Sequence, residues 1–272
     1  MPNIERRTGF ATAYGIYYET AGSGDWIVFL HAGMADARMW DDQFVSFAER
    51  FSVLRYDFQG YGRSRLTNEK VDHVADMLRV LDTLGVRDCH LVGASLGGQV
   101  ALDFTVRYPE RVNSLVLVGS GLSGYTAVDI TPPPQWHTAV AAFKAGDLDQ
   151  TAELELQIWL DGVGRTPADV DPQVRRRLFQ MNKMNLQAEK YRGRREATVD
   201  MPALDHLGHI KVPTLVMAGE LDQPEVIALT AKLAVEMPNA RKFLVPNTAH
   251  FPNMEKPTEF DQILQAFWAE LD

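Results

Sequence analysis

Apolar residues along the chain follow two alternating patterns. Short runs of apolar and β-branched residues, typical of buried strands, are separated by longer stretches in which apolar residues recur every three or four positions, as along one face of a helix. This alternation predicts an α/β fold with a mostly parallel central sheet flanked by helices. The predicted strands are Trp26–Leu30, Ser52–Tyr56, Cys89–Val92, Ser114–Val118, Thr214–Met217 and Lys242–Val245.

Two helical stretches stand out by their apolar spacing. The first covers residues 71–84, where valine, alanine and leucine side chains share one face. The second covers residues 260–271 and follows the helix start signal Lys256-Pro257-Thr258. We expect this last segment to be a C-terminal helix that packs on the sheet.

The alternation is interrupted between residues 124 and 207, where helix-like stretches occur without a strand-like run. This part includes Thr131-Pro132-Pro133-Pro134, a stiff connector that cannot lie inside a helix. We therefore predict an α/β core formed by residues 1–123 and 208–272, and an inserted helical cap formed by residues 124–207. Charged runs in the insertion, such as Arg175-Arg176-Arg177, are expected to face solvent.

The composition allows one large domain and argues against several partners. The 272 residues are 46% hydrophobic, which is enough for a sizeable core. A net charge of −9 argues against nucleic acid or an anionic membrane, since both attract clustered Lys and Arg. The single cysteine, Cys89, cannot form an intramolecular disulfide, and no apolar run is long enough to span a bilayer. We expect a soluble, cytoplasmic protein of undetermined oligomeric state.

The strongest chemical signal is the segment Gly93-Ala94-Ser95-Leu96-Gly97-Gly98. It directly follows the strand residues His90–Val92 and directly precedes the helix-like residues 99–108. A sharp turn at this place holds its central serine in a strained conformation that lifts the hydroxyl clear of the sheet, and small neighbours prevent collisions. A tight turn with an incidental serine would show the same short pattern, so the interpretation depends on partner residues elsewhere.

A serine hydroxyl is a poor nucleophile and needs a base and an orienting acid. In a parallel sheet these partners are expected at the same carboxyl edge, in the chain order serine, acid, histidine. Asp222 follows the strand at 214–217, and His250 follows the strand at 242–245. Glu220 and Glu225 remain alternatives to Asp222 as the acid.

The other histidines are weaker candidates for chemistry. His206 and His209 have the i, i+3 spacing of a metal-ligand pair, but no further ligand cluster accompanies them. We therefore predict no metal site. His250 alone lies in a loop past the last predicted strand.

Taken in order, these motifs resemble the α/β-hydrolase family in its branch with a helical cap, over nearly the whole chain. The resemblance also includes the segments His31-Ala32-Gly33-Met34 and Asp57-Phe58-Gln59-Gly60-Tyr61-Gly62-Arg63-Ser64. It implies that the backbone amides of Gly33 and Leu96 form an oxyanion hole. The chain departs from the family at Ala32, where glycine is usual, and at Gln59, where arginine is usual.

The chain is most similar to 3-oxoadipate enol-lactonases, carboxylesterases and meta-cleavage-product hydrolases. This resemblance implies a serine hydrolase of the carboxylesterase or lactonase type, without a cofactor, that acts on a small-molecule ester, lactone or similar carbonyl substrate. Ser95 would attack the carbonyl, His250 would accept its proton and Asp222 would orient the histidine. The alternatives are a carbon–carbon bond hydrolase of the meta-cleavage type, a perhydrolase or cofactor-free haloperoxidase, and more remotely a non-catalytic ligand receptor.

The cap is expected to determine which substrate is accepted, because it would cover the edge of the sheet where the catalytic loops gather. We expect the chemistry of the triad itself to be indifferent to the cap. Ordinary helix packing is an equal alternative for the predicted pocket residues. These are Met34, Trp136, Trp159, Met181, Met184 and Phe251.

Overall fold

The computed structural model describes residues 5–12, 15–67, 70–126, 131–192 and 199–271. Its centre is an eight-stranded sheet with the strand order β1-β2-β4-β3-β5-β6-β7-β8. The strands from β4 to β8 in this order are parallel, whereas β1 and β2 are antiparallel to their neighbours. The strands are β1 (Arg7–Ala11), β2 (Ile16–Ala21), β3 (Trp26–Leu30), β4 (Ser52–Tyr56), β5 (Cys89–Ala94), β6 (Val112–Val118), β7 (Thr214–Gly219) and β8 (Ala240–Val245).

Every strand predicted from the apolar runs is present, and the pattern missed only β1 and β2. β1 is an edge strand whose residues are mostly exposed, so it has no apolar run. β2 contains Glu19, which is buried because it forms ion pairs with Arg55 and with Arg63. Because the charged Glu19 occupies an inward-facing position, β2 lacks the apolar run that predicts a strand.

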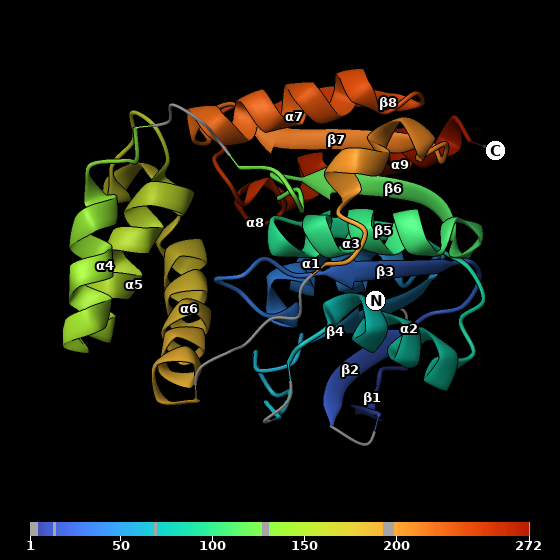
Figure 1. The fold of residues 1–272 in the computed structure, drawn as a ribbon, viewed down its shortest axis with the longest axis horizontal. Helices are drawn as coiled ribbons and strands as arrows, with labels where there is room; N and C mark the ends of the chain where they lie inside the picture. The colour runs from blue at the N-terminus through green and yellow to red at the C-terminus, as the bar shows by residue number, and fades with distance from the viewer. Residues whose placement is uncertain (1–4, 13–14, 68–69, 127–130, 193–198, 272) are drawn as a thin grey trace.

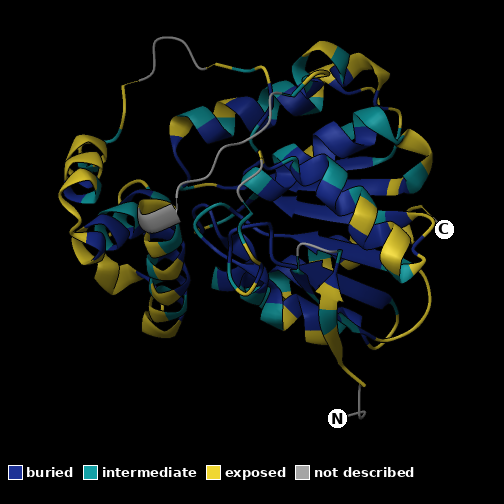
Figure 2. Ribbon diagram, turned by 60° about the horizontal axis from the view of Figure 1, so that its bottom comes forward, coloured by how far each residue is buried: buried dark blue, intermediate teal, exposed yellow. Residues whose placement is uncertain are grey.

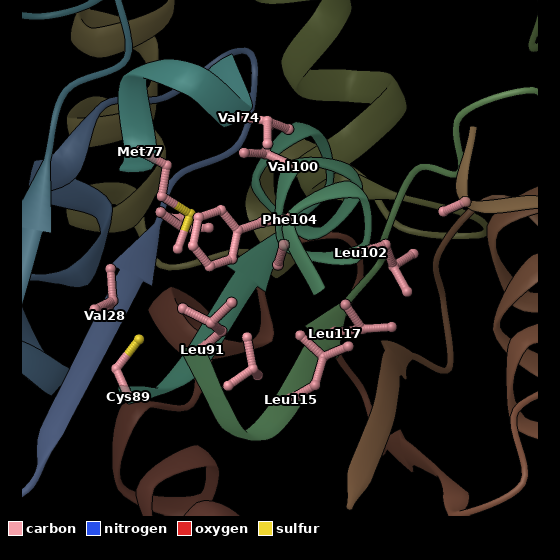
Figure 3. Packing of buried hydrophobic residues seen from close by; sticks show 14 of the residues in the cluster. Val28, Val74, Met77, Cys89, Leu91, Val100, Leu102, Phe104, Leu115 and Leu117 are labelled. Atoms are coloured by element: carbon pink, nitrogen blue, oxygen red, sulfur yellow. The ribbon is translucent and has the colours of Figure 1, made fainter. Parts of the chain in front are cut away.

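Helices cover both faces of the sheet (Figure 1). One buried apolar cluster joins the sheet to α2, α3 and α7, and a second joins its other face to α1 and α9. Figure 3 shows Met77 of α2 and Phe104 of α3 packed above Leu91 of β5. The core helices are α1 (Asp41–Phe47), α2 (His73–Leu84), α3 (Leu96–Arg107), α7 (Pro224–Glu236), α8 (Pro252–Glu255) and α9 (Pro257–Ala269).

The insertion lies between β6 and β7 and forms a helical layer beside the core, on the left of Figure 1. Figure 2 shows the contrast between the two parts: the central strands are buried, whereas the outer helices of the insertion carry many exposed residues. Within the described residues, no helix is long and apolar enough to cross a membrane. The insertion contains α4 (Gln135–Ala145), α5 (Leu148–Leu156), a π-helical turn (Gln157–Asp161) and α6 (Pro172–Arg192).

Two parts of the predicted insertion pack more closely than an exposed layer would. Ala203 and Leu207, which the predicted division places at the end of the cap, lie in one buried cluster with residues of α3. Arg175, expected on a solvated face, forms ion pairs with the buried Asp161 and with Glu153. A run of charged residues in the sequence does not reveal that one of them, Arg175, has a buried partner within the insertion.

The chain leaves and re-enters the core at one point on α3. The hydroxyl of Ser123 donates a hydrogen bond to the carboxylate of Asp103, and the amide of Ala203 donates to the same carboxylate at 3.2 Å. The Leu204 amide donates to the Ser123 carbonyl at 3.2 Å. The two ends of the insertion are thus held side by side.

Candidate active site

Ser95 occupies the turn between β5 and α3, with φ 51° and ψ −112°. A non-glycine residue with positive φ is strained, and such strain persists only where neighbours enforce it. Here the Ser95 amide donates to the Val118 carbonyl at 2.9 Å, while the Ser95 carbonyl accepts from the amides of Gln99 and Gly121, both at 3.0 Å. The neighbouring strand and the first turn of α3 therefore hold the serine in place.

Close packing around the turn requires glycine at Gly93 and Gly97. A Cβ atom at Gly97 would overlap the Leu30 carbonyl of β3, and one at Gly93 would overlap the Gly97 carbonyl. α3 can therefore start directly against the end of β3, which leaves Ser95 at the carboxyl edge of the sheet.

His250 and Asp222 form a buried pair in the loops that follow β8 and β7. The His250 Nδ1 lies 2.8 Å from the Asp222 Oδ2, and both side chains are almost fully buried. Gly119 permits this approach, because a Cβ atom there would lie 2.9 Å from the His250 Nδ1. Of the two alternative acids, Glu220 is exposed and Glu225 lines a separate hollow on the outer side.

Ser95 and His250 line the same cavity, which has a volume of about 260 Å³. It lies between the carboxyl edge of the sheet and the helices of the insertion. Its remaining wall is formed by Ala32, Gly33, Met34, Trp136, Glu155, Trp159, Asn182, Asn185, Leu186 and Glu189.

The loop after β3 brings the Gly33 backbone next to Leu96. A Cβ atom at Gly33 would lie 3.8 Å from the Leu96 Cβ. Within the described residues, no backbone carbonyl accepts a hydrogen bond from the amide of either residue. Gly33 lines the cavity, and Leu96 directly follows Ser95 at the start of α3.

His31 holds the loop after β3 in position through hydrogen bonds of its ring. Its buried ring accepts a hydrogen bond at Nε2 from the Phe58 amide at 2.9 Å, so the ring proton is on Nδ1 and is donated to the Ala32 carbonyl, also at 2.9 Å. His31 thus connects the loops after β3 and β4, while Ala32, Gly33 and Met34 of the same motif line the cavity.

Asp57 links the same two loops. Its carboxylate accepts hydrogen bonds from the Ala37 and Arg63 amides, each at 2.8 Å. Burial, and secondarily the charge of Asp36, raise the pKa of Asp57 to about 6. A carboxyl group is therefore retained at a buried place where ionisation is costly.

The structure separates the predicted pocket residues into three groups. Met34, Trp136 and Trp159 line the cavity. Met181 and Phe251 are buried in the apolar cluster beneath it. Met184 is 44% exposed, and its sulfur lies 3.6 Å from an Arg38 nitrogen.

The polar wall of the cavity was not predicted. Asn182, Asn185 and Glu189 follow one another at three- and four-residue spacing on α6, and Leu186 lies on the same face. Helical periodicity could have grouped these residues. The sequence-based expectation of an apolar pocket does not include them.

The π-helical turn of the insertion contacts the loops that carry His250 and Asp222. The Trp159 ring lies 4.9 Å from the His250 ring, and the Trp159 carbonyl accepts a hydrogen bond from the His250 amide at 3.0 Å. The Gln223 side chain donates to the Ile158 carbonyl at 2.6 Å. The insertion therefore helps to form the site and does more than cover it.

A buried ion pair strengthens this contact. Arg165 lies 2.7 Å from Glu255, and it also donates to the carbonyls of Leu160 and Asp161 at 2.7 Å. The other Glu255 oxygen accepts from the Ala249 amide at 2.8 Å, directly beside His250. Burial raises the pKa of Glu255, while the hydrogen bond from Arg165 opposes this shift.

No group of three or more metal-ligating side chains is placed together in the described part of the chain. His206 and His209 lie side by side, with ring centroids 6.1 Å apart, in a 3₁₀ helix away from the cavity. The side chains that line the cavity therefore supply acid–base chemistry.

Sequence relatives of the chain are hydrolases. The chain is 29% identical over 251 residues to a pimeloyl-[acyl-carrier protein] methyl ester esterase of Aeromonas hydrophila, covering 92% of this chain and 97% of the relative. It is 26% identical to a 2-hydroxy-6-oxo-6-phenylhexa-2,4-dienoate hydrolase of Comamonas testosteroni, covering 91% and 89%.

Solved structures show the same fold. An enzyme that degrades N-acyl homoserine lactones superposes with a TM-score of 0.74 and 27% identity, over 96% of this chain and 100% of that one. The enol-lactonase of Burkholderia xenovorans gives a TM-score of 0.78 at 22% identity, over 97% and 100%, and this likeness concerns the fold alone. The model of the alpha/beta hydrolase family matches residues 27–263. The chain therefore belongs to the alpha/beta hydrolase family.

Proposed function

We propose that this protein is a serine hydrolase that cleaves an ester or lactone through Ser95, His250 and Asp222. One observation carries the proposal: Ser95 and His250 line one cavity, and the Nδ1 atom of His250 is hydrogen-bonded to the buried Asp222. A histidine held in this way presents its other nitrogen as a base.

The mechanism follows from these positions. The Ser95 hydroxyl attacks the substrate carbonyl carbon while the His250 Nε2 accepts its proton, and Asp222 stabilises the imidazolium that forms. The amides of Gly33 and Leu96 donate hydrogen bonds to the developing oxyanion, an interaction worth about 2.7–4 kcal/mol per donor. The leaving group takes the proton from His250, and water activated by His250 then hydrolyses the acyl-enzyme.

Relatives support the ester or lactone class, and the cavity wall favours it over carbon–carbon cleavage. One relative is named for a methyl ester and one solved neighbour for N-acyl homoserine lactones, whereas another relative is named for a dienoate, which carries a carboxylate. In this chain Glu155 lines the cavity. Its carboxyl group disfavours an anionic substrate.

A Ser95→Ala variant tests the proposal. We expect it to lose covalent labelling by a fluorophosphonate and nearly all turnover on a panel of esters and lactones. Ser120→Ala is the matched control, because Ser120 is buried beside the turn that carries Ser95 and donates its hydroxyl proton to the Gly121 carbonyl. Labelling that survives in Ser95→Ala, or turnover that depends on Ser120 instead, would refute the assignment of the nucleophile.

A further inference from the structure

The polar part of the cavity wall, on α5 and α6, is acidic. It is formed by Glu155 of α5 and by Asn182, Asn185 and Glu189 of α6. The Asn182 amide donates a hydrogen bond to the Glu155 Oε2 at 2.7 Å, and Asn182 is only 2% exposed. Asn182 therefore positions the Glu155 carboxyl group within the wall.

Glu155 is a carboxyl group without a neutralising partner. In the described part of the chain, no arginine, lysine or histidine forms an ion pair with it. Burial raises its pKa, and the charge of Glu189 raises it further. A half-buried carboxylate such as that of Glu155 is stabilised most by an opposite charge or a strong hydrogen-bond donor.

Two tryptophans line the same cavity. Trp136, at the start of α4, and Trp159, in the π-helical turn, both line the cavity. The face of an indole ring attracts organic cations, and tryptophan is the best of the aromatic side chains in this role. Indole faces combined with a carboxylate are a chemical environment suited to an alkylammonium group.

We propose that the cavity selects esters or lactones whose acyl or alcohol part carries a positively charged nitrogen. Glu155 and the two tryptophans bind this group while the carbonyl lies at Ser95. The inference rests on the proposed function for the reaction, but the binding of the cation itself requires no turnover.

Matched esters that end in a trimethylammonium, a tert-butyl or a carboxylate group test the preference. One series carries these groups on the acyl part and a second carries them on the alcohol part. In at least one series we expect kcat/KM to be about tenfold higher for the ammonium than for the isosteric tert-butyl ester, and lower again for the carboxylate. The assays are run well above the ordinary pKa range of carboxyl groups.

Glu155→Gln keeps the size of the side chain and its oxygen acceptor for Asn182, but removes the charge. We expect the ratio of ammonium to tert-butyl turnover to fall to near one, and Trp136→Leu to reduce it partly. Asp149→Asn is the control: it makes the same change of net charge on α5, where Asp149 is exposed and pairs with Lys183. This control keeps the preference.

Calorimetric binding of the ammonium and tert-butyl esters to Ser95→Ala separates this inference from the proposed reaction. Tighter binding of the ammonium ester that Glu155→Gln abolishes supports the cation site, even if no ester is turned over. Equal binding of both esters overturns the cation site, and so does a preference that survives in Glu155→Gln. If the wild-type protein binds the ammonium ester but shows neither fluorophosphonate labelling of Ser95 nor ester turnover, only the proposed reaction is refuted.

Discussion

The residues proposed to carry the chemistry depart from ordinary local preferences. Ser95 has a positive φ that glycine would adopt more easily, and Asp222 is an acid that is almost fully buried. Each departure is enforced by neighbours: backbone hydrogen bonds from β6 and α3 for the serine, and the His250 ring for the acid. Local strain and burial of this kind point to function because stability alone would not maintain them.

Asp222→Asn should leave the fold intact and lower kcat by orders of magnitude, about 10⁴-fold in a comparable triad. The amide nitrogen can replace the carboxylate oxygen only by favouring the wrong histidine tautomer. Steady-state kinetics and circular dichroism check both statements. Glu220→Gln is the control, since Glu220 is exposed; a larger loss there than in Asp222→Asn would identify a different acid.

Asp57 predicts a pH dependence of stability. Its folded pKa of about 6 lies above the ordinary value of 3.8, so the folded state binds the proton more tightly than the unfolded state. The contribution of Asp57 to the free energy of unfolding is fully present below pH 3.8 and is lost as the pH rises through about 6. The total loss is about 3 kcal/mol. Denaturant unfolding of the wild type and Asp57→Asn over this range measures the difference. A difference independent of pH would contradict the prediction.

The positions of Ser95, Asp222 and His250 could be predicted because each follows a strand, and strands are visible as apolar runs. The structure brings all three to one edge of the sheet. Glu155 and Asn182 could not be paired from the sequence. They lie on different helices, and which faces of those helices meet depends on the packing of the whole insertion.

At the scale of elements, the π-helical turn bears on the expected roles of the cap and the core. From the sequence, the cap should determine which substrate is accepted, and the reaction at the catalytic residues should not depend on the cap. The hydrogen bond from the His250 amide to the Trp159 carbonyl connects the two directly. π-Helical turns inside helices are frequent at functional sites, but no pattern in the sequence predicts the turn at Gln157–Asp161.

Glu255→Gln should lower kcat more than it changes KM, on the order of tenfold to a hundredfold, because the loop that carries His250 loses its link to Arg165. Unfolding temperature should also fall, since breaking a buried ion pair leaves a charge without a partner. Glu259→Gln removes a surface pair with Lys256 and serves as the control. Unchanged kinetics with a lowered unfolding temperature would mean that the pair serves stability only.

At the scale of the whole molecule, the central strands form a rigid base for the site. Cys89 begins β5, is fully buried, and donates weakly to the Arg111 carbonyl at 3.7 Å. Burial raises the pKa of its thiol well above the ordinary value. Since the chain has a single cysteine, this thiol reports on opening of the sheet.

Labelling of Cys89 by a thiol reagent should be about a thousandfold or more slower in native buffer than in denaturant, because the reagent reaches it only after large-scale opening. Mass spectrometry of timed samples measures both rates, and Cys89→Ser confirms where the label is attached. Rapid, complete labelling without denaturant would show that this end of β5 opens independently of the rest of the sheet.

The hydrogen bonds that hold Ser123 and Ala203 at Asp103 have an evolutionary consequence. A segment whose two ends meet at one place can be exchanged as a unit, because its replacement leaves the distance that the core must bridge unchanged. Recombination could therefore supply a new substrate range to an old catalyst in one step. A transplanted segment would still have to offer a carbonyl oxygen to the His250 amide, so successful exchanges should be recognisable by that one inherited contact.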